Sequence, residues 1–115
     1  MRKNDPLFEL RELIGDPGFA SAEELGSFCL AVGLFLGEKE TGSKGAPRHW
    51  DPTDFGIWPM VEIIAYTEEP GIKNMKEMKE YLYPYLLGGI GIVAKKVGKR
   101  SGLEALKALS DLIPP

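Results

Sequence analysis

The sequence predicts an all-α fold, a compact single-domain bundle of about five helices over residues 1–115, with a kinked or split central helix. Three observations predict it. Helix-start signals recur along the chain, apolar residues follow each of them at helical spacing, and no run alternates with the period of two that a half-buried strand requires. With 43% apolar residues, the chain can bury one core without a disulfide or a metal ion.

Capping boxes mark two of the helix starts. Ser21 is followed three residues later by Glu24, which predicts a helix that ends near Gly37. This helix is apolar on most sides, so we expect it to be largely buried. Ser101 and Glu104 form the second box, which predicts a short final helix ended by two prolines.

Proline marks two further helices. Asp5-Pro6 combines a capping residue with proline at the first helical position, and Gly15 is a typical helix end. Residues 52–56 should form one turn before a helix from about Trp58 to Thr67. The predicted inner face of that helix consists of Met60, Ile63, Ile64 and Thr67.

The longest helix is predicted at about 75–98, opened by Asn74 as its cap. Pro84 should kink it or split it, because proline removes a backbone hydrogen bond and clashes with the preceding turn. The second half is apolar nearly all round, which places it at the centre of the core. There, Gly89 and Gly91 are expected to face a neighbouring helix at short range, a better account of the glycines than a phosphate loop.

Charge is unevenly distributed along the chain. Residues 1–70 hold six basic and thirteen acidic residues, a net −7, whereas residues 71–115 hold eight basic and four acidic residues, a net +4. This asymmetry favours a partner for the basic half or self-association of opposite faces. A solvated surface with chance clustering explains it equally well.

The N-terminus has no apolar segment typical of a signal peptide, and no apolar stretch reaches the roughly 20 residues that span a bilayer. We therefore expect a cytoplasmic protein that does not bind membranes. The chain has no Gln and two Asn, a composition typical of thermophile proteins.

The densest basic cluster predicts a nucleic-acid-binding site. On a continuing helix, Lys95 and Lys99 stack at i and i+4 with Lys96 and Arg100 beside them, which makes a two-turn stripe suited to phosphate. Arg48, in the long loop at 38–51, is assigned to the same site. A purely structural role competes, because cations near a helix C-terminus also stabilise the helix dipole.

No catalytic, metal-binding or cofactor-binding residues are predicted. The long aperiodic loop at 38–51, expected to be more mobile than its flanking helices, holds the single histidine, His49. The nearby carboxylates match no metal motif: Glu38, Glu40, Asp51, Asp54 and Glu62. A small nuclease-like enzyme that uses His49 and these carboxylates stays an alternative. The single cysteine, Cys29, lies in an apolar run and is interpreted as core filler.

The order of the apolar blocks resembles a known family. Phe28–Gly37 is similar to the phenylalanine-led, glycine-containing helix of small proteins associated with DNA phosphorothioation (dnd) restriction systems. A polar loop, an apolar helix at Trp58–Thr67 and a glycine-rich apolar run at Tyr85–Val93 follow in the same order. The chain departs from that pattern at Pro59 and Pro84 and in its extra C-terminal helix.

The resemblance implies an accessory role. The leading hypothesis is a non-catalytic accessory or interaction subunit of a prokaryotic nucleic-acid-handling complex for DNA modification or defence, with weak, sequence-tolerant binding to the phosphate backbone. A protein partner or a homo-oligomer is expected as well. The alternatives are the small enzyme and a self-associating structural module without a nucleic-acid ligand.

Overall fold

The structure is a computed structural model that describes residues 6–40 and 55–112. The described residues form helices only: α1 (Pro6–Ile14), α2 (Ala22–Leu36), α3 (Trp58–Glu68), α4 (Met75–Val97) and α5 (Gly102–Ser110). The predicted all-α bundle is therefore confirmed. Most of the predicted loop at 38–51 and the turn at 52–56 lie outside the described residues.

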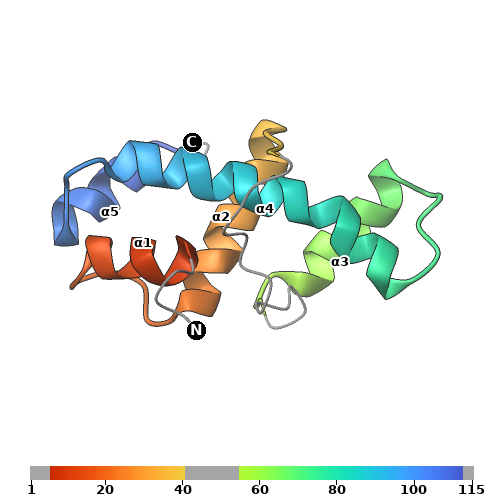
Figure 1. The fold of residues 1–115 in the computed structure, drawn as a ribbon, viewed down its shortest axis with the longest axis horizontal. Helices are drawn as coiled ribbons and strands as arrows, with labels where there is room; N and C mark the ends of the chain where they lie inside the picture. Colours follow the sequence, from red (N-terminus) through yellow and green to blue (C-terminus); the bar gives the residue numbers. More distant parts are fainter. Residues whose placement is uncertain (1–5, 41–54, 113–115) are drawn as a thin grey trace.

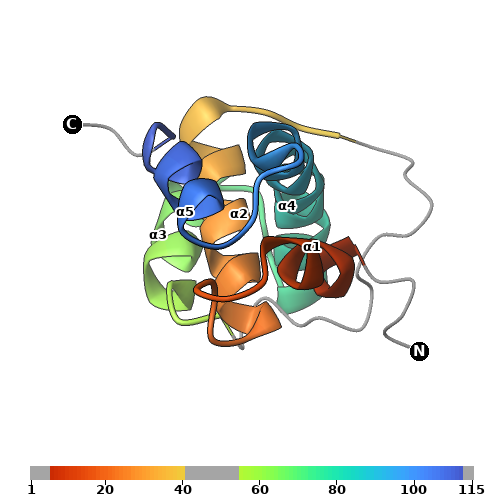
Figure 2. The ribbon, with the colours of Figure 1, turned by 90° about the vertical axis from the view of Figure 1, so that its left-hand side faces the viewer.

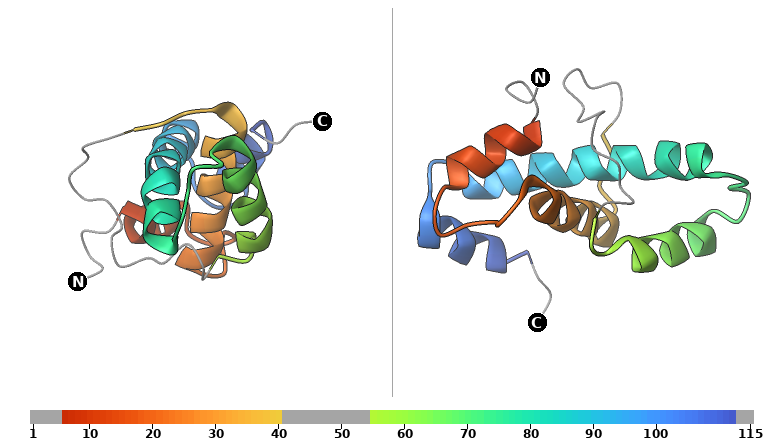
Figure 3. Two further views of the ribbon diagram at one scale, coloured as in Figure 1. Left: turned by 90° about the vertical axis from the view of Figure 1, so that its right-hand side faces the viewer. Right: turned by 90° about the horizontal axis from the view of Figure 1, so that it is seen from below.

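The helices are arranged around α4, the longest element (Figure 1). α2 crosses the middle of α4, and this is the largest interface between two helices. α1 and α5 lie together at the C-terminal end of α4, where each contacts it (Figure 2). α3 packs beside the N-terminal half of α4, at the opposite end of the molecule (Figure 3).

Local signals set most helix ends as predicted. The hydroxyl of Ser21 accepts a hydrogen bond from the Glu24 amide at 3.1 Å, and the Asn74 side chain accepts one from the Glu77 amide at 2.9 Å. Ser101 differs, because its side chain makes no capping hydrogen bond although α5 begins directly after it. The next residue, Gly102, has φ +57°, so the chain enters α5 through a left-handed residue.

Pro84 does not split α4, which is one continuous helix from Met75 to Val97. Proline removes the amide that would bond the carbonyl of Glu80, four residues earlier. Glu80 is an exposed residue, so the missing bond lies on the solvent side of α4 and not in the core. The turns on both sides of the proline are held by burial of Leu82 and Leu86, each 1% exposed.

Glycines allow the close crossing of α2 and α4. A Cβ atom at Gly89 would overlap the carbonyl oxygen of Cys29, and one at Gly33 would overlap the carbonyl oxygen of Tyr85. Each helix thus presents a glycine to the backbone of the other. Gly89 confirms the prediction of short-range contact, whereas Gly91 contradicts it, since it is exposed on the far side of α4.

The predicted inner face of α3 is wrong. Met60 and Ile63 are 66% and 67% exposed, and the residues that face the core are Val61 and Ala65. Thr67 is exposed too. Apolar residues surround most of α3, so their spacing alone could not tell which stripe would be covered. The helix lies at the edge of the bundle, and only one side of it meets the core.

Candidate nucleic-acid interface

The predicted basic cluster falls at the end of α4 and in the turn that follows. The helix ends at Val97, and the amide of Gly98, with φ +56°, donates to the carbonyl of Ala94 at 3.0 Å. Lys99 and Arg100 therefore lie beyond the helix, and the predicted continuous two-turn stripe does not form. The reason is that glycine ends α4 one turn earlier than the stripe requires.

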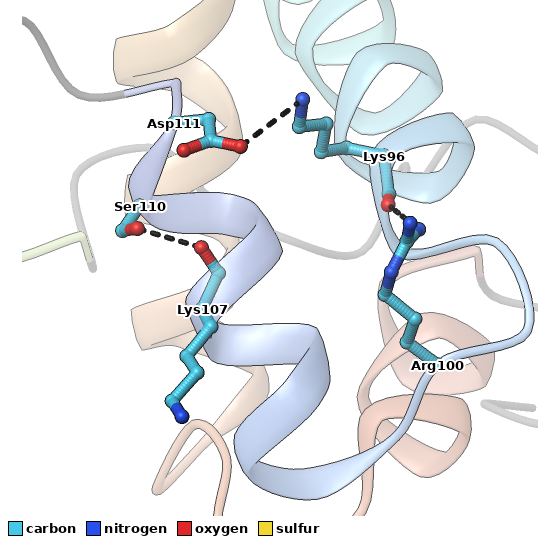
Figure 4. Close-up of polar contacts among 5 residues, drawn as sticks. All are labelled: Lys96, Arg100, Lys107, Ser110 and Asp111. Carbon is cyan, nitrogen blue, oxygen red and sulfur yellow. Dashed lines mark hydrogen bonds and ion pairs between the residues drawn. The ribbon is translucent and has the colours of Figure 1, made fainter.

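The turn nevertheless brings part of the cluster back towards α4. The Arg100 guanidinium donates to the carbonyl of Lys96 at 3.0 Å, so its planar group covers the last turn of the helix (Figure 4). This contact satisfies a carbonyl that the helix itself leaves without a partner. Arg100 thus has a structural role in ending α4, as the competing interpretation of the cluster expected.

A groove of about 430 Å³ separates the end of α4 from α5. Four cationic side chains line it: Lys95, Lys96, Arg100 and Lys107. Of the predicted residues, Lys99 is exposed in the turn but does not line the groove, and Arg48 lies outside the described residues. The groove exists because α5 folds back beside α4 (Figures 2 and 4).

Lys107 is a groove residue that the sequence prediction missed. It lies in α5, and only the packing of α5 against α4 brings it to the groove. The surplus of positive charge over residues 71–115 was the one available signal, but it carried no information about position.

Two carboxylates moderate the positive charge of the groove. Asp111 Oδ2 lies 3.5 Å from Lys96 Nζ, and the two side chains are 69% and 39% exposed (Figure 4). Glu104 also lines the groove. With four cations and two carboxylates, the lining carries a formal charge of +2. An exposed ion pair of this kind contributes only about 0–1 kcal/mol, so an incoming phosphate can compete for the lysine.

The residues considered for catalysis are not brought together where they are described. His49, Asp51 and Asp54 lie outside the described residues, while Glu38 and Glu40 are exposed after α2 and Glu62 is on α3. Within residues 6–40 and 55–112, no three His, Cys, Asp or Glu side chains group in a way that could hold a metal ion.

Cys29 is fully buried at the crossing of α2 and α4, where burial raises the pKa of its thiol well above the ordinary value. The interpretation of Cys29 as core filler is confirmed. A thiol in this setting stays protonated, and it is the thiolate that reacts.

None of the described helices combines the length and the apolar character needed to cross a membrane. Comparison with protein-family models, with curated proteins and with solved structures finds no match to this chain.

Proposed function

We propose that this protein is a non-catalytic accessory subunit that binds the phosphate backbone of nucleic acid in the groove between α4 and α5. The observation that carries the proposal is the convergence of cations from two helices on one open groove. Helix-end stabilisation accounts for Lys95 and Lys96 in the last turn of α4 and for Lys107 in the last turn of α5, but it does not require these side chains to converge on one groove. The dnd-like order of apolar blocks supports a cytoplasmic setting in a DNA-modification or defence complex, away from membranes.

Binding of this kind should be weak and insensitive to sequence. Lysine and arginine contact phosphate oxygens through charge, and no base-reading motif accompanies the basic cluster. The net charge of −3 opposes association at long range. The end of α4 that lines the groove is at the opposite end of the molecule from α3, whose charged residues are both acidic, which reduces that opposition (Figure 1).

The test is fluorescence anisotropy with a labelled duplex and a labelled single strand at several salt concentrations. For four cations on duplex DNA, the logarithm of the binding constant should fall with the logarithm of salt concentration with a slope of about −3 to −4. The double variant K95Q/K107Q removes one cation from each side of the groove, so the slope should become less negative by about 2.

The matched control is K73Q/K76Q. It removes the same charge from exposed positions near the start of α4, at the opposite end of the molecule. The control should bind like the unmodified protein. Equal losses in both variants, or no binding to either probe at low salt, would contradict the proposal.

A further inference from the structure

An apolar groove with a volume of about 200 Å³ lies between α2 and α3. Its walls are Leu34 and Phe35 from α2, Met60 and Ile64 from α3, and Ile57, the N-cap residue of α3. Phe35 and Met60 are 62% and 66% exposed, and Ile64 is 39% exposed. We call these five residues the α2–α3 apolar surface. Single exposed apolar residues are common on proteins, but a hollow lined by several of them marks an interaction site.

The spacing of the exposed side chains fits a helical ligand. Along α3, Ile57, Met60 and Ile64 follow at i, i+3 and i+7, so they form one stripe along one side of the groove. Phe35 stands on the other side, in the last turn of α2. Two ridges with an apolar hollow between them accept the apolar face of an amphipathic helix, which anchors with residues at the same spacing.

The charges near this surface indicate the sign of the charge that a ligand should carry. α3 contains two carboxylates, Glu62 and Glu68, and no lysine, arginine or histidine, and the last turn of α2, which carries Phe35, has no charged residue. Glu68 lies one turn beyond Ile64, on the same side of α3. It is also in the last turn of the helix, where the helix dipole is negative and a cation would be favourable. No residue of that last turn supplies one.

This charge pattern decides between occupants. A second copy docked face to face would add a second Glu68 carboxylate and no cation from α3 or from the last turn of α2, and an anionic membrane surface would be repelled by Glu68. A cationic ligand would instead gain from Glu68 and from the end of the α3 dipole. From these observations, we propose that the α2–α3 apolar surface binds a basic amphipathic helix of a partner protein.

The test uses a designed peptide as the probe. A fluorescein-labelled 14-residue peptide carries Leu at i, i+3, i+4 and i+7 and Lys at most other positions, and a second peptide has Glu in place of Lys. We expect the Lys peptide to bind at least tenfold more tightly than the Glu peptide, because only the former complements the carboxylates.

Variants locate the binding. The double variant F35S/M60S should weaken binding of the Lys peptide at least tenfold. The control L13S/L103S alters two side chains that are 64% and 56% exposed on α1 and α5, and it should bind normally. Glu68→Gln should weaken binding about threefold, whereas Glu12→Gln, an exposed carboxylate on α1, should not. All four variants change exposed positions only, so circular dichroism should report an unchanged fold.

Three results would overturn the proposal. One is equal binding of the Lys peptide to F35S/M60S and to the control. Another is tighter binding of the Glu peptide. The third is a dimer, detected by light scattering, that F35S/M60S abolishes, which would make a second copy the occupant. The outcome is independent of the nucleic-acid proposal, because K95Q/K107Q leaves the α2–α3 apolar surface intact.

Discussion

The two ends of the molecule expose different chemistry. At the C-terminal end of α4, the groove beside α5 is lined mainly by cations, whereas α3, beside the N-terminal half of α4, exposes apolar side chains and has carboxylates as its charged residues. Exposed lysines cost little, since water solvates them and the end of α4 gains from their charge. Exposed Phe35 and Met60 gain nothing from water, so the isolated fold does not explain them. This contrast is the basis of the two proposals, an anionic ligand at one end and a cationic ligand at the other.

Between these ends lies the crossing of α2 and α4, on which both surfaces depend. α2 contributes Phe35 to the apolar end, and α4 contributes Lys95 and Lys96 to the basic end. A change that separates the two helices should therefore disturb both surfaces, while a change at one surface should leave the other intact.

The largest effect is expected from Gly89→Ala. Its Cβ would lie 2.6 Å from the carbonyl carbon of Cys29, so the helices must separate, at a cost of about 3 kcal/mol. The matched control is Gly91→Ala, where the nearest atom is Glu40 Oε2 at 3.4 Å. That change should stabilise the protein by up to about 1 kcal/mol, because alanine favours helix. Urea unfolding measures the free energy of unfolding of both variants. Equal values would show that α2 and α4 do not cross closely at Gly89.

The next largest effect concerns salt, which should weaken ligand binding to different extents at the two ends of the molecule. Raising salt from 50 to 200 mM should weaken nucleic-acid binding roughly 100-fold, as expected for about four phosphate contacts. Binding of the Lys peptide should change less than about fivefold, because burial of apolar area supplies most of its free energy. Anisotropy titrations at both salt concentrations test this. A similar loss for both ligands would mean that the peptide binds through charge alone.

A smaller effect should follow from Asp111→Asn. The change frees Lys96 from its ion pair, so nucleic-acid affinity should rise up to about fivefold, the equivalent of an exposed pair worth up to about 1 kcal/mol. Glu80→Gln removes the same charge from the opposite half of α4 and should have little effect. If both variants bind equally well, net charge rather than the groove determines affinity.

The smallest effect concerns Tyr81, which lies on α4 near the apolar end. Burial, then a hydrogen bond with Tyr85 and the charges of Glu68 and Glu69, raise the pKa of Tyr81 from 10.0 to about 12. Its contribution to the free energy of unfolding is thus fully present below pH 10 and is lost as the pH rises towards 12. Glu68→Gln should lower the pKa of Tyr81, measured by absorbance at 295 nm with Tyr81→Phe as the reference. An unchanged pKa would show that the Glu68 charge does not reach α4.

The sequence by itself determined the fold class and most helix ends. Serine, asparagine and glycine act on the backbone within one turn, so Ser21, Asn74 and Gly15 mark the ends of α2, α4 and α1 wherever those helices lie. The sequence also placed the most apolar part of α4 in the core, since a run that is apolar all round has no solvent-facing side to offer.

Only the tertiary structure decided which surfaces remained exposed. α3 has two apolar stripes, and packing covered Val61 and Ala65 while it left Met60 and Ile63 outside. Packing likewise placed Lys107 across a groove from Lys95, although they belong to different helices. Contacts between distant segments depend on how helices cross, and here the crossing depends on Gly33 and Gly89 meeting backbone to backbone. Helical periodicity describes one element at a time, so it could not supply that information.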